Sequence, residues 1–191
     1  MPREIIGVSI SKLSDEIIRK STSLLTVSAL ILFIVFTVTV LPSQSENARE
    51  QSGESSPDMS FFFTVDELYG IAESYGEAGR DAYVKARFTF DLVWPVVYTL
   101  FLASSISWLF SRSFNNDSVL QRANLVPVIG MSLDYLENIS ASIVMLRYPT
   151  RTPFIDTLAV VFTPLKWAFV GGSFIVVMIG FGKYGIKRIR G

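Results

Sequence analysis

The chain has 191 residues, of which half are hydrophobic and only 18% are charged, and its 17 basic residues balance 17 acidic ones. Because soluble domains carry about 25% charged residues, this composition favours membrane spans. The absence of Cys and His excludes disulfides, thiolate catalysis, haem ligation by histidine and ordinary zinc sites. The zero net charge argues against nucleic-acid binding. We therefore expect no cofactor, no metal and no nucleic-acid partner.

The first segment is a cytoplasmic amphipathic arm, residues 1–22. Its apolar residues fall mostly on one face of a helix, and Lys12, Asp15, Glu16 and Lys20 lie elsewhere. Two interpretations stay open. The arm lies on the inner leaflet of the bilayer, or it contacts the cytoplasmic loop of the same chain.

Residues 23–42 form the first predicted transmembrane helix. Positions 23–41 carry no charge, and at 1.5 Å per residue this stretch crosses roughly 30 Å of hydrocarbon. An extracellular linker, residues 43–63, follows and is rich in Ser, Glu and Gly in its first part. It ends in three Phe residues, 61–63, which we expect either at the membrane interface or in a hydrophobic staple ahead of the next helix.

Residues 64–87 are predicted to form an extracellular amphipathic helix. Thr64 and Glu67 have the spacing of a capping box, and apolar residues then recur at helical spacing. We expect this helix to run into the second span and to form a cap outside the membrane.

The remaining segments alternate between spans and short connections. In chain order they are transmembrane helix 2 (88–110), a cytoplasmic loop (111–123), transmembrane helix 3 (124–147), an extracellular turn (148–153), transmembrane helix 4 (154–182) and a basic cytoplasmic tail (183–191). Ten Lys and Arg flank the spans on the side of the termini, against six on the opposite side. The positive-inside rule then places both termini in the cytoplasm of a multi-pass cell-membrane protein. The predicted fold is an all-α, antiparallel bundle of four transmembrane helices.

Polar residues inside the spans carry the functional signal. A charge at mid-membrane costs about 2.5–3.5 kcal/mol, so such residues face the interior of a bundle. Asp134, Glu137 and Asn138 stand at i, i+3 and i+4 and share one helix face, as do Asp91 and Tyr98 one span earlier. Arg87 precedes Asp91 by four positions and can pair with it. At comparable depth the polar groups would form a pocket at mid-membrane that opens outward, with Arg87 and Arg147 near its rim. In this pocket we expect Glu137, Asn138 and Lys166 to approach one another, with Tyr98 facing them. The predicted ligand-binding residues are Arg87, Asp91, Tyr98, Asp134, Glu137, Asn138 and Lys166.

Four short motifs occur in order along residues 64–170. They are Gly79-Arg80-x-x-Tyr83, Asp91-x-x-x-Pro95-x-x-Tyr98, Asp134-x-x-Glu137-Asn138 and Pro164-x-Lys166-Trp167. This ordered set resembles an uncharacterised family of small prokaryotic four-span membrane proteins. The resemblance implies the four-span fold and a shared polar centre, and it implies no activity.

Three classes of function remain open. The first is a pocket that binds a small amphiphile, a lipid headgroup or a cation. The second is a membrane enzyme that uses carboxylate and lysine acid-base chemistry on a lipid-like substrate. The third is a structural subunit, either of a homo-oligomer or of a larger membrane complex. No residue is assigned a catalytic role, and the lipid bilayer is the one partner common to all three.

Overall fold

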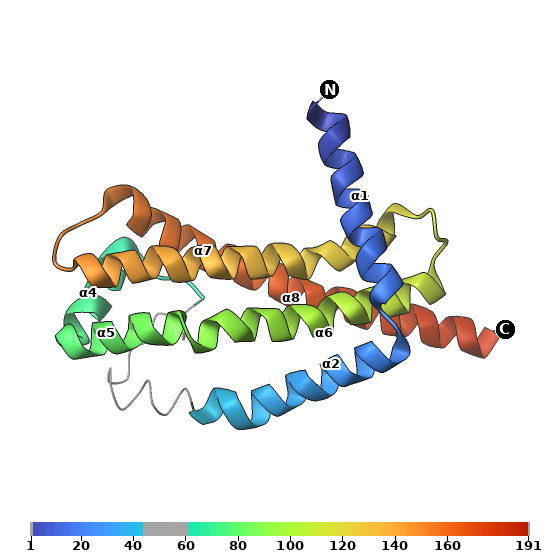
Figure 1. Cartoon of the computed structure of the whole chain (residues 1–191), viewed down its shortest axis with the longest axis horizontal. Helices are drawn as coiled ribbons and strands as arrows, with labels where there is room; N and C mark the ends of the chain where they lie inside the picture. The colour runs from blue at the N-terminus through green and yellow to red at the C-terminus, as the bar shows by residue number, and fades with distance from the viewer. Residues whose placement is uncertain (1, 44–60, 191) are drawn as a thin grey trace. The chain divides into compact units, whose positions relative to one another are not determined.

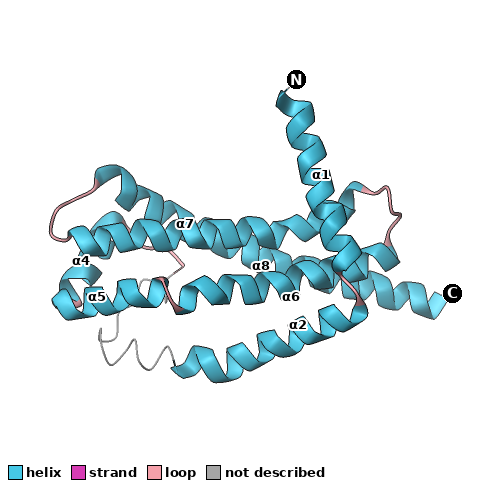
Figure 2. Ribbon diagram, in the orientation of Figure 1, coloured by secondary structure: helices cyan, strands magenta, loops and turns pink. Residues whose placement is uncertain are grey.

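A computed structural model describes residues 2–43 and 61–190 of the chain. Within these two ranges the chain is helical and contains no strand (Figure 2). The predicted all-α class is therefore confirmed. The predicted linker, residues 43–63, lies almost wholly outside the described residues.

The helices follow one another along the chain in the order labelled in Figure 1. They are α1 (Pro2–Lys20), α2 (Ser23–Val35) with its π-helical continuation η1 (Phe36–Val40), α4 (Val65–Ser74), α5 (Gly76–Arg87), α6 (Phe90–Ser113), the 3₁₀ helix η3 (Val119–Leu125), α7 (Val126–Arg147) and α8 (Pro153–Arg190).

Three segments of the described chain are long and apolar enough to cross a membrane. They are Ser23–Ser43, Gly76–Ser113 and Pro153–Arg190. This composition is that of a membrane protein. The predicted third span, α7, is not among them, because its carboxyl and amide side chains lower its mean hydropathy. The arrangement of four spans in an antiparallel bundle stays a prediction.

The segment predicted as one helix over residues 64–87 is two helices. Gly76 has a φ of 61°, a left-handed conformation that residues with a Cβ rarely adopt, and it stands where α4 gives way to α5. The start of α4 is as predicted. The backbone N–H of Glu67 donates to Thr64 Oγ1 (3.2 Å), and the backbone N–H of Thr64 donates to Glu67 Oε2 (2.6 Å). The capping box is confirmed.

The last helix is longer than predicted. α8 continues to Arg190, so the described part of the predicted tail, residues 183–191, is helical rather than an extension beyond the helix. Lys187, Arg188 and Arg190 occupy its last turn. Cations there interact favourably with the helix dipole, which explains why the helix need not stop at the end of the apolar run.

The chain divides into two compact units, each assembled from distant parts of the sequence. Unit 1 comprises Met1–Phe33, Val97–Ile129 and Phe169–Gly191. In it, α1 packs against η3. The side chain of Ser14 donates to Asn124 Oδ1 (2.9 Å), and Asn124 Nδ2 donates to the carbonyl of Ser14 (3.1 Å) and to Ser107 Oγ (3.0 Å). The N-terminal arm therefore contacts the segment between α6 and α7, as the second of its two interpretations required.

Unit 2 comprises Ile34–Val96 and Gly130–Ala168. Its apolar core joins α4, α7 and the start of α8, with Leu68, Val144 and Ala159 fully buried. Phe63 belongs to the same core, whereas the two Phe residues before it are exposed. Since Phe63 directly precedes the Thr64 cap and Leu68 is the fourth helical residue, this arrangement fits a hydrophobic staple.

Candidate functional site

The main candidate site lies in unit 2, where Lys166 of α8 reaches two acidic residues of α7. The ammonium group forms an ion pair with Glu137 and lies 3.6 Å from Oδ1 of Asp134. The three side chains are 10%, 5% and 12% exposed for Lys166, Glu137 and Asp134 respectively. The two acids meet one lysine because they stand three residues apart and so share a helix face.

Neutral hydrogen-bonding groups complete this arrangement. Thr163, one turn before Lys166 on α8, donates to Glu137 Oε1 (2.7 Å) and lies 3.0 Å from the carbonyl of Ala159. Asn138 Nδ2 donates to Asp134 Oδ1 (3.4 Å). We call Asp134, Glu137, Asn138, Thr163 and Lys166 the carboxylate–lysine cluster. The sequence prediction omitted Thr163, although its i−3 spacing from Lys166 was a signal for the same helix face.

Burial is unfavourable for the charged groups of this cluster. Taking an ion out of water costs several kcal/mol even after relaxation, and the cost is offset only by close opposite charges and further hydrogen bonds. The cluster supplies both: an ammonium group beside two carboxyl groups, and a hydroxyl and an amide that donate to those carboxyls. Such a site can hold groups of either sign, because it contains charged donors and charged acceptors within a few ångströms.

A second predicted pair lies elsewhere in unit 2. Arg87, at the end of α5, forms an ion pair with Asp91, in the first turn of α6, as their i, i+4 spacing predicted. The guanidinium group also lies 4.3 Å from the ring centre of Tyr83. The side chains of this pair are 9% and 13% exposed. Tyr98, the remaining predicted site residue, falls in unit 1, where it is buried.

The structure also contains a polar network that the sequence did not reveal. The backbone N–H of Thr152 donates to the phenolic oxygen of Tyr69 (2.8 Å), and the Tyr69 hydroxyl donates to Asp156 Oδ2 (3.4 Å). All three side chains are buried. We call this the Tyr69 network. It ties α4 to the start of α8 across more than 80 residues of sequence, a separation that no local pattern records.

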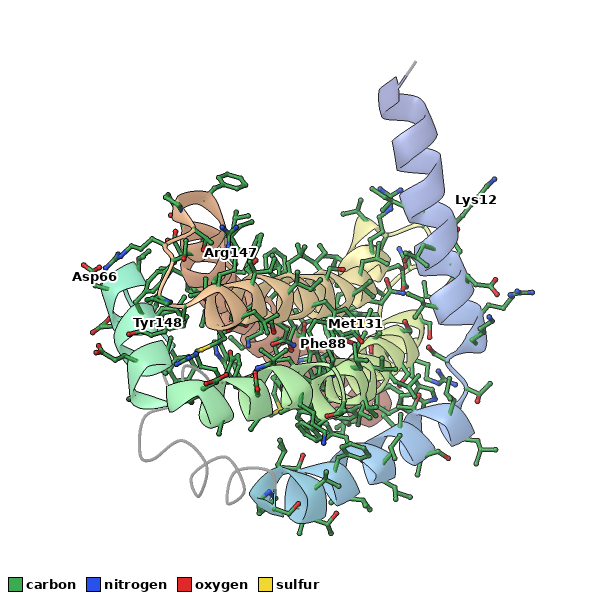
Figure 3. The ribbon with its side chains drawn as sticks, turned by 60° about the vertical axis from the view of Figure 1, so that its left-hand side comes forward. Lys12, Asp66, Phe88, Met131, Arg147 and Tyr148 are labelled. Atoms are coloured by element: carbon green, nitrogen blue, oxygen red, sulfur yellow. The ribbon has the colours of Figure 1, made fainter. Side chains whose placement is uncertain are left out.

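An exposed ion pair lies beside the Tyr69 network. Arg151 Nη2 lies 2.7 Å from Oδ1 of Asp66, and its guanidinium group is 4.7 Å from the ring centre of Tyr69. The hydrogen bond to Asp66 raises the pKa of Arg151. Figure 3 shows Asp66 on the outer side of α4, and Arg147 and Tyr148 at the end of α7. We predicted Arg147 at the rim of the pocket, and it is exposed.

The described residues contain no group of three acidic side chains in a position to hold a metal ion. Comparison with protein-family models, with curated proteins and with solved structures finds no match to this chain. The function has to be argued from the side chains alone.

Proposed function

We propose that the protein is an integral protein of the cell membrane, with both termini in the cytoplasm, whose carboxylate–lysine cluster binds a small amphiphile, a lipid headgroup or a cation in a pocket that opens outward. The observation that supports this is the contact of Lys166 with both Asp134 and Glu137. Ionisable side chains within a membrane are expensive, and they commonly mark a substrate, ion or proton site.

The composition of the cluster suits an amine-bearing or zwitterionic group. The carboxyl groups of Asp134 and Glu137 can accept hydrogen bonds from an amine or attract a quaternary ammonium group by charge, and Lys166 attracts a phosphate or carboxylate. An amphiphile would leave its apolar part among the apolar side chains of the spans, where no polar partner is needed.

The competing explanation is a network that only fixes the helices. Neutral hydroxyl and amide groups can do this in membranes, at about 0.6–2 kcal/mol for each interhelical hydrogen bond. Replacing a buried ion pair with apolar residues of similar size is often neutral or stabilising. Packing alone therefore gives little reason to bury two carboxylates and a lysine, which favours a ligand.

Native mass spectrometry in a mild detergent tests the proposal. We expect the wild-type protein to retain a small molecule. The double variant Lys166→Met with Glu137→Gln removes one charge of each sign, so it should fold and lose that molecule. The matched control makes the same two replacements at exposed positions, Lys85→Met with Glu73→Gln, and should keep it.

Two results would overturn the proposal. One is a wild-type protein that carries no small molecule across a panel of mild detergents and added lipids. The other is retention of the same molecule by wild type and by the Lys166 and Glu137 double variant. Either result would leave the carboxylate–lysine cluster with a structural role in a subunit or complex.

A further inference from the structure

Unit 1 carries a strong positive charge although the whole chain is neutral. It contains ten Lys and Arg and four Asp and Glu, a net charge of +6. Seven of its basic side chains are exposed and form no ion pair with any residue in the described ranges: Lys12, Arg112, Arg122, Lys183, Lys187, Arg188 and Arg190. This charge is available to an external anion.

Two aromatic rings stand among these cations where α6 and α8 approach their C-terminal ends. The ring centres of Trp108 and Tyr184 are 5.3 Å apart, and the indole N–H of Trp108 donates to Ser23 Oγ (2.7 Å). The helices are close here, because a Cβ on Gly180 would lie 3.1 Å from the Cβ of Leu109. Trp and Tyr are enriched at the level of lipid headgroups, where one side of the ring meets apolar chains and the other meets water.

The cations around these rings are held by neutral partners. The guanidinium group of Arg112 lies 4.1 Å from the ring centre of Trp108. Lys187 Nζ donates to the carbonyl of Arg112 (2.9 Å), and Arg188 Nη1 donates to the hydroxyl of Tyr184 (3.3 Å). These contacts fix where the cations lie without cancelling their charge. The three cations and two rings form one cationic and aromatic surface, which we call the basic surface.

Exposed apolar side chains accompany the charges elsewhere in unit 1. On α1, Ile10 and Leu13 are exposed beside Lys12, whose side chain points away from the ribbon in Figure 3. On η3, Val119 and Leu120 are exposed beside Arg122. Because α1 is hydrogen-bonded to η3, these two apolar and basic segments lie next to each other in unit 1. A nucleic acid or an acidic protein loop would match the charges and leave the apolar side chains in water, whereas a membrane surface matches both.

We propose that the basic surface binds anionic phospholipids of the cytoplasmic leaflet, through contacts of Arg112, Lys187 and Arg188 with the lipid phosphate and headgroup. Trp108 and Tyr184 set the depth at which these cations meet the headgroups. A basic side chain near an anionic membrane contributes about a fivefold factor in affinity. The choice of the cytoplasmic leaflet rests on the orientation proposed above, with both termini in the cytoplasm, whereas the binding of anionic lipid does not depend on the carboxylate–lysine cluster, which lies in unit 2.

Quenching of tryptophan fluorescence by brominated lipids tests the proposal directly. The reporter protein keeps Trp108 and carries Trp94→Phe and Trp167→Phe, so that Trp108 is the one emitter. It is reconstituted into vesicles of phosphatidylcholine with increasing fractions of brominated phosphatidylglycerol, and separately of brominated phosphatidylcholine. We expect phosphatidylglycerol to quench at lower mole fractions, which shows selective occupancy next to Trp108.

Charge variants identify the residues responsible. Lys187→Gln with Arg188→Gln should lower the relative affinity for phosphatidylglycerol by about fivefold for each charge removed. Lys85→Gln with Arg147→Gln removes the same two residue types from exposed positions in unit 2 and should leave the affinity unchanged. The exchange Lys187→Arg with Arg188→Lys keeps both charges and should preserve binding, which separates charge from folding.

The proposal fails if both brominated lipids quench Trp108 equally. It also fails if Lys187→Gln with Arg188→Gln lowers the relative affinity for phosphatidylglycerol no more than Lys85→Gln with Arg147→Gln does. A protein that binds heparin or an acidic peptide through Lys187 and Arg188, with no preference among lipids, would show that the surface serves a soluble polyanion instead.

Discussion

The two units bury polar side chains of different kinds. In the described part of unit 1 every buried polar side chain is uncharged, and the Ser14, Ser107 and Asn124 network is the clearest case. Unit 2 buries ionisable groups, among them Glu137 and Lys166. The buried side-chain hydrogen bonds that join distant helices of unit 1 in this network thus come from hydroxyl and amide groups. The comparison teaches that charge is not required for packing in this chain, so the charges buried in unit 2 call for a different explanation.

The units also differ in the charge they carry. Unit 2 contains seven Lys and Arg and thirteen Asp and Glu, a net charge of −6, which is opposite to the net charge of unit 1. Basic flanks tend to stay in the cytoplasm, whereas acidic residues contribute little to orientation. The orientation that we propose therefore follows from the basic residues of unit 1.

The largest expected effect is all-or-none and concerns that orientation. A Cys at Asn115, in the predicted cytoplasmic loop, and a Cys at Ser52, in the predicted extracellular linker, should differ in labelling when an impermeant maleimide is added to intact cells. The Ser52→Cys protein should be labelled, and Asn115→Cys should react only after the cells are opened. The chain has no Cys of its own, so the background is low. The opposite pattern would show that the basic surface faces outside.

The next prediction tests the buried charges of unit 2. Lys166→Met keeps the length of the side chain but leaves Asp134 and Glu137 buried without the ammonium group. Breaking a buried pair in this way costs about 3–5 kcal/mol of the free energy of unfolding. Adding Glu137→Gln should restore much of the loss, because one acid remains to be accommodated instead of two. Reversible unfolding in detergent and SDS mixtures measures the cycle.

Lys85→Met serves as the control for this cycle, since Lys85 is exposed and forms no described ion pair. It should change the free energy of unfolding by less than about 0.5 kcal/mol. A coupling energy near zero between positions 137 and 166 would mean that the two side chains do not meet, and the carboxylate–lysine cluster would be lost with them.

A third prediction tests the uncharged hydrogen-bond network of unit 1. Asn124→Ala removes hydrogen bonds to Ser14 and Ser107 and leaves their buried groups unsatisfied, at about 2–3 kcal/mol in total. Because the network is uncharged, the loss should be the same at low and high salt. The exposed Asn116→Ala is the matched control and should be nearly neutral. A strong salt dependence of the Asn124 variant would erase the distinction between the two units.

Local spacing predicted the parts of this structure that depend on neighbouring residues. The capping box at Thr64 and the Arg87 pair with Asp91 span three or four positions, so the helical repeat alone determines them. The contact between Lys166 and Glu137 was also foreseen, because a lysine inside a membrane span has few ways to offset its charge except a buried carboxylate.

Other features could not be read from local spacing. Gly70, Gly76 and Gly79 all weaken the predicted helix, and nothing in the sequence selects Gly76 as the break. The Tyr69 contact with Thr152 joins positions 83 apart, and the Ser14 contact with Asn124 joins positions 110 apart. Such pairs depend on tertiary packing, which a single sequence records only as buried apolar periodicity.

The smallest expected effect concerns the helix that begins at Thr64. Thr64→Ala removes the side chain that accepts from the backbone N–H of Glu67, and the loss of an N-cap costs about 1 kcal/mol of the free energy of unfolding.

Glu67 adds a pH dependence to the same cap. Its hydrogen bond from the backbone N–H of Thr64, reinforced by the Thr64 hydroxyl, lowers the pKa of the Glu67 carboxyl. A lowered pKa in the folded state means that the carboxylate stabilises the fold above the unfolded pKa, and that this contribution is lost as the pH falls through the folded pKa. Amide hydrogen exchange in α4 should therefore quicken, relative to the intrinsic rate, between neutral and acidic pH in the wild-type protein. Glu67→Gln should flatten that dependence, whereas the exposed Glu73→Gln should keep it. Equal pH dependence in all three proteins would show that the capping box does not limit the opening of α4.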